Sequence, residues 1–219
     1  METALQNIAL AQAWEVYNER IFPIQYLIWL IAVFTVLFLL LKKGNNKNTI
    51  TVVLGAFWLW SGIFFHILIV TDFAKAGYWF GTIFILQGLF FFYEALFRNR
   101  FTYEKLQHPR HVAGYSIILT SLIIYPFWGL VAGREISQVL LPGLPAPTAI
   151  FTFGILLLSS QKFPLYLLVI PAFIALSGLW RAFEIKHYED ILLFASGAVT
   201  VSWLLRRRKY DKVKNAPLE

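Results

Sequence analysis

Seven apolar runs, separated by short polar segments, follow one another along the chain. A helix needs about 20 residues to cross a hydrocarbon core of ~30 Å, and most of these runs come close to that length. The fifth run covers only roughly 21 Å at 1.5 Å per residue, which is short of a full crossing. The pattern predicts helical spans at Pro23–Leu41, Thr49–Val70, Tyr78–Phe97, Val112–Val131, Pro147–Ser160, Pro164–Trp180 and Asp190–Leu205.

The distribution of basic residues decides whether the fifth run crosses. If all seven runs cross and the N-terminus lies outside, fourteen Lys and Arg residues fall on the inner side and five on the outer side. If the fifth run does not cross, the division becomes nine inside and ten outside. Cytoplasmic segments of membrane proteins carry an excess of Lys and Arg, so the first division is favoured. We therefore predict an all-α polytopic membrane protein, a seven-transmembrane helical bundle with its N-terminus out and its C-terminus in.

Two further segments flank the predicted transmembrane domain, residues 23–205. Residues 1–22 are predicted to be an extracytoplasmic amphipathic segment, because the apolar positions between Leu5 and Asn18 favour the outer membrane interface. This segment is acidic rather than basic, so we expect the first span, and not a cleavable signal peptide, to direct insertion. Residues 206–219 form a basic tail that we expect beside anionic lipid in the cytoplasm.

The composition fits a bilayer better than water. Hydrophobic residues make up 58% of the chain and charged residues 14%, against about 25% charged in ordinary globular domains. The 21 Phe and eight Trp exceed what one soluble core of this length would bury. The net charge of +7 comes from short clusters between apolar runs, which indicates membrane topology and not a nucleic-acid partner.

Several classes of membrane protein need residues that this sequence lacks. With no Cys, disulfides and thiolate chemistry are excluded. The last predicted span has no Lys for a retinal Schiff base, and paired haem ligands are missing because His66 is the one His within a span. His108, His111 and His187 fall in predicted loops, and hydrolase, Walker and Rossmann motifs are absent. The sequence thus gives no catalytic or metal-binding residue, identifies no cofactor, and argues against redox and hydrolytic enzymes.

Polar side chains inside the predicted spans are candidates for a functional site, because they are costly in a bilayer. His66 shares one helix face with Trp58 and Gly62, and it has two interpretations: a hydrogen bond to a neighbouring helix, or a ligand-binding or proton-handling role. Gln87 has the same two interpretations, since amide side chains also join helices. For Glu94 we favour a structural role, with Arg98 one turn away as its partner.

Other polar, aromatic and proline residues gather at the predicted outer ends of the spans. The run Leu144–Thr148 opens the short fifth helix there, and a helix that starts at Pro147 would direct its positive dipole end at this region, where anions are favoured. The alternative is a pair of well-packed outer loops. The candidate ligand-binding residues are His66, Gln87, Tyr125, Thr148, Glu189, Asp190, Tyr17 and Asn18.

The order of these outer features resembles a known family. Its short motifs are Tyr17-Asn18, Pro23-x-Gln25, Trp60-x-Gly62 before His66, Gln87-Gly88, Tyr125-Pro126, Pro145-Ala146-Pro147-Thr148, Phe151–Gly154, Ile170-Pro171 and Glu189-Asp190. Together they resemble a bacterial seven-span membrane family catalogued as a domain of unknown function, some members of which are labelled permeases. The resemblance spans nearly the whole chain and implies a multi-pass protein of the bacterial plasma (inner) membrane. Similar sequences often carry Cys between the two prolines, where this chain has Ala146, so any thiol-dependent activity of the family would be missing here.

Two functions follow as hypotheses. The first is a permease-like protein that handles or binds a small solute or ion from the outer side, because the polar features cluster there. The second is a non-catalytic accessory or assembly subunit, in contact with a partner subunit or with a second copy of itself in the lipid bilayer. The aromatic content supports the second, with Phe90-Phe91-Phe92 as a possible packing surface for another chain.

Overall fold

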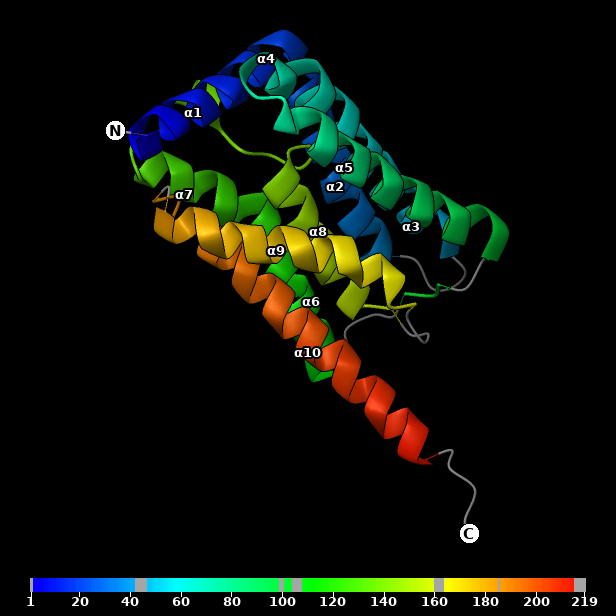
Figure 1. The fold of residues 1–219 in the computed structure, drawn as a ribbon. Helices are drawn as coiled ribbons and strands as arrows, with labels where there is room; N and C mark the ends of the chain where they lie inside the picture. Colours follow the sequence, from blue (N-terminus) through cyan, green and yellow to red (C-terminus); the bar gives the residue numbers. More distant parts are fainter. Residues whose placement is uncertain are drawn as a thin grey trace.

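The computed structural model describes residues 2–41, 47–98, 101–103, 108–159, 164–184 and 186–214, and within these ranges it is all-helical with no strand. The long helices run side by side at a slant, while α1 lies across one end (Figure 1). The elements are α1 (Glu2–Ile21), α2 (Ile24–Leu41), α3 (Lys47–Trp60) continued by the π-helix η1 (Ser61–Val70) and α4 (Thr71–Phe73), α5 (Ala76–Tyr93) continued by η2 (Glu94–Arg98), α6 (Pro109–Leu119), η3 (Thr120–Ile124), α7 (Tyr125–Val131), the 3₁₀ helix η4 (Ile136–Gln138), α8 (Pro145–Leu157), α9 (Tyr166–Glu184) and α10 (Asp190–Lys214).

Among the described residues, five helical stretches are long and apolar enough to cross a membrane. They correspond to the first four predicted spans and to the sixth, and they are Ile24–Leu41, Asn48–Phe73, Ala76–Arg98, Pro109–Val131 and Tyr166–Glu184. The predicted all-α membrane architecture is confirmed at this level. The boundaries differ locally: α9 begins at Tyr166, after Pro164, and α10 continues as a helix to Lys214, past its predicted end at Leu205.

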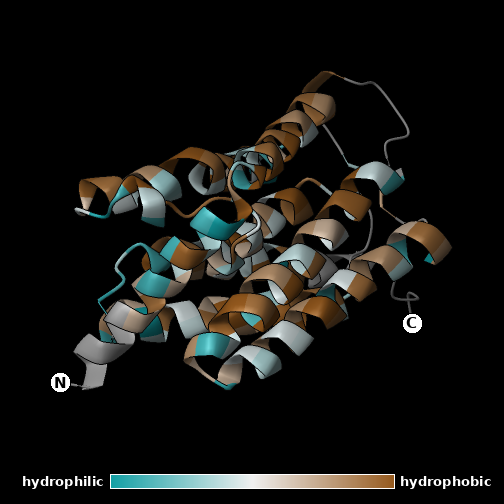
Figure 2. Ribbon diagram, turned by 90° about the horizontal axis from the view of Figure 1, so that it is seen from above, coloured by the Kyte–Doolittle hydropathy of each residue, from teal (hydrophilic) through white to brown (hydrophobic). Residues whose placement is uncertain are grey.

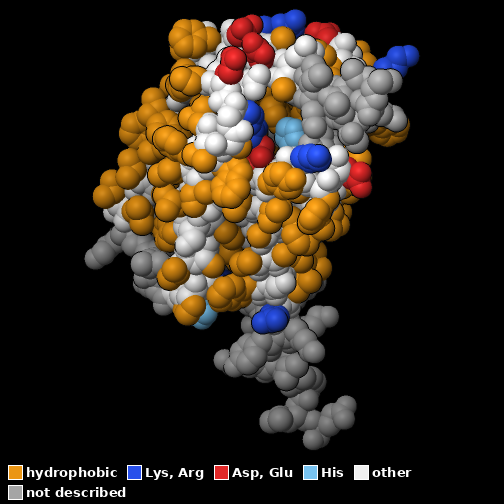
Figure 3. All heavy atoms as spheres, turned by 90° about the vertical axis from the view of Figure 1, so that its left-hand side faces the viewer, with side chains coloured by type: hydrophobic (Ala, Val, Ile, Leu, Met, Phe, Trp, Pro, Cys, Tyr) orange, Lys and Arg blue, Asp and Glu red, His pale blue; other side chains and the backbone are white. Residues whose placement is uncertain are grey.

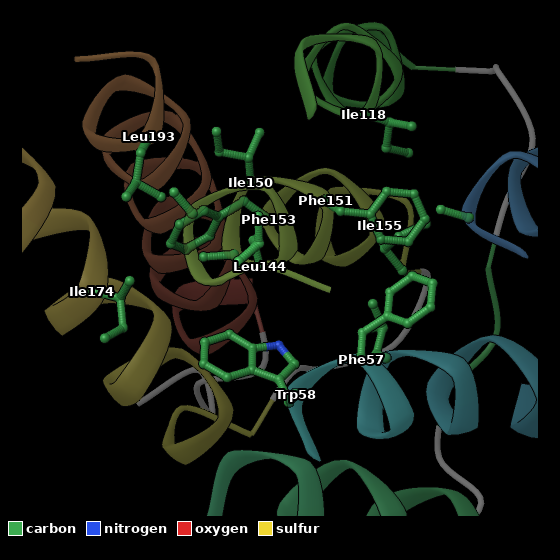
Figure 4. Close-up of a cluster of buried hydrophobic side chains, with 14 of the residues drawn as sticks. Phe57, Trp58, Ile118, Leu144, Ile150, Phe151, Phe153, Ile155, Ile174 and Leu193 are labelled. Atoms are coloured by element: carbon green, nitrogen blue, oxygen red, sulfur yellow. The ribbon is translucent and has the colours of Figure 1, made fainter. Parts of the chain in front are cut away.

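The short helix α8 lies at the centre of the bundle. Every residue from Ala146 to Leu157 is buried, and α8 packs against α3, α6, α9 and α10. Its side chains point outward in several directions toward Trp58, Ile118 and Leu193 of the surrounding helices (Figure 4). A helix that is apolar all round is stable when it is enclosed by others. With 13 residues, about 20 Å, α8 therefore has no lipid-facing side to match to the bilayer thickness.

Three glycine pairs bring helices into close contact, two of them between α3–η1 and α5 and one between α8 and α6. A Cβ on Gly62 would lie 2.9 Å from the carbonyl oxygen of Gly81, which joins η1 to α5. A Cβ on Gly154 would lie 2.7 Å from the carbonyl oxygen of Gly114, which joins α8 to α6. Gly55 and Gly88 make the third pair. Small residues at such contacts let helix backbones approach closely, which is how helices associate in a membrane.

The amphipathic segment predicted at the N-terminus forms α1, which packs on the end of the bundle. One face is buried, at Ala13, Trp14, Tyr17, Asn18 and Ile21, with the spacing of a helical stripe. Helix α1 contacts η1 and η4, so Ala13, Trp14 and Tyr17 of the predicted segment are covered by protein, and Val16 is partly buried.

On the face shown in Figure 3, hydrophobic side chains cover the middle of the molecule, and most of the charged side chains lie in its upper part. Brown, hydrophobic residues also run along most of the helices in the orthogonal view (Figure 2). Trp79 is 76% exposed and Phe34 62%, as expected of residues that face lipid. The proposed packing surface at Phe90-Phe91-Phe92 is mostly internal, because Phe91 is fully buried and Phe90 packs edge-on against Tyr166.

Candidate functional site

A cavity of about 250 Å³ lies beneath α1, at the end of the bundle that we call the cavity end. It is formed by α1, η1, α5, α7, the start of α8, α9 and α10. Its apolar wall consists of Leu10, Trp14, Phe65, Val70, Ala76, Phe80, Phe84, Leu140, Leu144, Pro145, Ala146, Pro147, Ile174 and Trp180. Its polar residues are His66, Tyr125, Ser177, Arg181 and Asp190. Mainly apolar walls with a few converging polar groups are typical of small-molecule sites.

Asp190 is the centre of a hydrogen-bonded network that joins three helices. The Tyr125 hydroxyl donates to Asp190 Oδ1 over 2.7 Å, and Arg181 Nε donates to Asp190 Oδ2 over 2.7 Å. Arg181 Nη1 also donates to Ser177 Oγ over 3.1 Å, one helical turn earlier in α9. As the first residue of α10, Asp190 also benefits from the positive end of that helix. The network links α7, α9 and α10, and within it the charges of Arg181 and Asp190 neutralise each other.

His66 lies across the cavity within the π-helix η1 and is 6% exposed. Its Nδ1 is 3.0 Å from the Ser61 carbonyl oxygen, which accepts only, so the proton of the uncharged ring is on Nδ1 and Nε2 is an acceptor. The ring lies 4.5 Å from that of Phe84, centre to centre. Tyr125 also directly follows a π-helical stretch, η3. Such stretches recur at functional sites because they re-aim side chains.

A second charged cluster lies beside the cavity and holds its wall in place. Arg134 forms an ion pair with Glu189, whose Oε1 is 3.5 Å from His187 Nδ1. Trp14 contacts two residues of this cluster: Arg134 Cζ lies 5.1 Å from the centre of its ring, and the His187 ring lies 5.0 Å away, centre to centre, in a T-shaped arrangement. Burial raises the pKa of Glu189, but the hydrogen bond from His187 and the charge of Arg134 outweigh it and hold the pKa below its ordinary value. Glu189 thus positions Trp14 and is not itself part of the cavity wall.

Of the predicted site residues, the structure brings His66, Tyr125 and Asp190 together around one cavity. The other candidates lie outside its wall and support the surrounding structure. Thr148 Oγ1 accepts from the Gly143 N–H, and the Tyr17 hydroxyl accepts from Trp60 Nε1. Asn18 donates to the carbonyl oxygens of Ser137 and Val139, and Gln87 donates to that of Leu167.

Arg181, Ser177 and Trp14 are the site residues that were not predicted. The sequence places Arg181 in the same outer turn as Glu189 and Asp190 but does not make it a candidate, although Ser177 and Arg181 at i and i+4 share a helix face toward Asp190. One placement is corrected: His111, predicted in a loop, lies in the first turn of α6, where its Nε2 accepts from Arg110 Nε over 3.1 Å.

The fold and the site together define a polytopic all-α membrane protein with a cavity at one end of its bundle. The chain belongs to the family described as "Family of unknown function (DUF6064)", which matches residues 9–215 and so confirms the resemblance seen in the sequence. No curated protein and no solved structure matches the chain.

Proposed function

We propose that this chain is a permease-like protein of the bacterial plasma membrane, which crosses the bilayer seven times and binds a small solute in the cavity. The observation that carries the proposal is the convergence of His66, Tyr125, Arg181 and Asp190 on one apolar cavity. Ionisable groups in membrane-spanning segments are retained mainly where they serve function.

The positions of the helix ends support seven crossings. At the cavity end, Arg20 in the last turn of α1 lies 3.6 Å from Asp72, and the start of α8 and the first residue of α10 line the cavity. At the opposite end, the Tyr166 hydroxyl donates to Glu94, and Ser159 pairs with Tyr103. We therefore assign the seven crossings to α2, α3–η1, α5, α6–α7, α8, α9 and α10.

The charge distribution supports an orientation with the cavity end outside. The short connections at the cavity end contain Lys75, Arg134 and Lys186, while more Lys and Arg residues lie in the segments at the opposite end and in the C-terminal tail. The positive-inside rule then directs the C-terminus to the cytoplasm and the cavity to the outer face.

Native mass spectrometry of the protein extracted gently from its own membranes tests the proposal. The wild-type chain is expected to retain a defined small molecule, and Ala146→Phe is expected to lose it because the ring occupies the cavity. Ala56→Phe, which enlarges an exposed alanine of α3, is the matched control and should retain it. A mass equal to that of the bare polypeptide in all three proteins, with no adduct, would contradict a solute site. A stable complex with another polypeptide would favour the accessory-subunit alternative.

A further inference from the structure

We infer that the cavity takes an uncharged, mainly apolar molecule the size of a substituted aromatic ring, with one head group that both donates and accepts a hydrogen bond. A hydroxyl or a primary amide meets this description. The inference rests on the proposed function and specifies its ligand.

The size and the walls set the apolar part of this ligand. A dry protein cavity of about 150 Å³ accommodates benzene, so about 250 Å³ leaves room for a ring and its substituents. Aromatic rings form much of the wall, among them Trp14, Phe80, Phe84 and Trp180. Offset or edge-on packing against such rings favours an aromatic ligand beyond the burial of apolar area.

The charges of the wall exclude an ion as the preferred occupant. Arg181 and Asp190 are paired at 2.7 Å, so the cavity wall has no net charge to offer a ligand. A charged ligand would either remain unpaired in an apolar cavity, at a large cost in free energy, or break that ion pair. The geometry therefore selects against carboxylates, ammonium groups and inorganic ions.

The start of α8 does not supply the anion site that its position predicts from the sequence. The helix begins at Pro145, two residues before its predicted start, and neither Pro145 nor Pro147 has a backbone N–H. The N–H of Thr148 donates to the carbonyl oxygen of Leu144 over 3.1 Å. Ala146 alone is left among the first three positions, whereas anion-binding helix starts present several N–H groups together.

Two residues of the cavity wall, His66 and Arg181, each keep one polar atom that an uncharged head group can use. His66 Nε2 is an acceptor, and Arg181 Nη2 is a donor. Within the described part of the chain neither atom has a hydrogen-bond partner, and neither is sealed inside the protein. A hydroxyl or a primary amide can donate to His66 and accept from Arg181, and a plain hydrocarbon can do neither.

Fluorine NMR with the protein in lipid nanodiscs tests the ligand class. The probes are 4-(trifluoromethyl)benzyl alcohol, 4-(trifluoromethyl)benzamide, 4-(trifluoromethyl)benzoate and 4-(trifluoromethyl)toluene, each compared with empty nanodiscs to remove partition into lipid. The alcohol and the amide are expected to bind saturably and about tenfold more tightly than the toluene, as one or two net hydrogen bonds provide. The benzoate is expected not to compete with them.

Two variants connect binding to the cavity and to its head-group site. Ala146→Phe should abolish saturable binding of every probe, whereas Ala56→Phe should not change it. His66→Phe keeps a ring against Phe84 and removes Nε2, so it should lower the affinity of the alcohol several-fold toward that of the toluene, because the bond from Arg181 remains, and it should not weaken the toluene.

The outcomes separate this inference from the proposed function. Saturable benzoate binding that Ala146→Phe abolishes would overturn the uncharged class and leave the cavity as a solute site. An unchanged preference for the alcohol in His66→Phe would overturn the head-group assignment. If no probe binds saturably, the inferred class is wrong, and a small molecule retained in native mass spectrometry would still support the proposed function.

Discussion

Replacing Asp190 by Asn is expected to lower the free energy of unfolding by about 3 kcal/mol. The Asp190 side chain is 4% exposed, and its two oxygens accept from Tyr125 and Arg181. Asn can still accept from the Tyr125 hydroxyl, but it leaves the buried guanidinium without a counter-charge. Removal of one partner from a buried ion pair typically costs about 3–5 kcal/mol. We take the lower end because the Arg181 side chain is 22% exposed, so water compensates for part of the loss.

The assay is reversible unfolding in mixed micelles of a mild detergent and SDS, followed by the fluorescence of the eight Trp residues. The control is Glu184→Gln, which removes an exposed carboxylate from the end of α9. Tyr125→Phe should cost about 2 kcal/mol, because it removes one hydrogen bond to a charged group and leaves the ion pair intact. The reasoning is refuted if Asp190→Asn lies within about 0.5 kcal/mol of the control, the usual range of surface substitutions.

Three other changes test separate parts of the structure by the same unfolding assay. Gly154→Ala should lower the free energy of unfolding by about 1–3 kcal/mol, because the added Cβ meets the rigid carbonyl of Gly114. In Gly178→Ala the added Cβ meets the movable end of a Leu side chain, so this control should cost less. Equal losses in the two variants would count against close backbone packing at Gly154. Thr148→Val should lower the free energy of unfolding by about 1–3 kcal/mol, because it leaves the buried N–H of Gly143 without its acceptor. Thr148→Ser keeps the hydroxyl and should recover most of that loss. Equal losses in the two variants would mean that the hydroxyl is not important. The pKa of Glu189 is lower in the folded than in the unfolded protein, so its carboxylate stabilises the fold above the unfolded pKa of about 4.5 and loses this contribution as the pH falls through the folded pKa. Glu189→Gln should therefore make the free energy of unfolding less dependent on pH below about pH 4.5. An unchanged pH dependence would contradict the role given to Glu189.

The helices were predictable because the bilayer imposes a simple rule on composition and length. Long apolar runs mark helices such as α2 and α5, whose outer faces must match lipid. Their ends were less predictable, because proline tolerates several first-turn positions, as at Pro145 and Pro147 in α8. The central position of α8 could not be predicted either, because a short apolar run has the same sequence pattern whether protein or lipid surrounds it.

The site was predictable where a polar residue stood alone in an apolar run, as His66 does. Among the charged residues of the outer turn, the sequence singled out Asp190 but not Arg181, because the burial of a charged residue near a helix end depends on which helices pack together. Gln87 and Thr148 show the reverse case. Their polar groups bond to nearby backbone inside the bundle, and no sequence pattern separates that role from ligand binding.

Cysteine labelling at Ala146 tests the central claim most directly, and the natural chain contains no Cys to interfere. Ala146→Cys places a thiol on the cavity wall, Ala149→Cys places one in the fully buried part of the same helix, and Lys75→Cys lies exposed at the cavity end. A membrane-impermeant methanethiosulfonate applied to the outside of intact spheroplasts should modify Ala146→Cys and Lys75→Cys but not Ala149→Cys. Reaction of Lys75→Cys alone would mean that the cavity is sealed from the outer face, and reaction of Ala146→Cys only from the inner face would contradict the orientation.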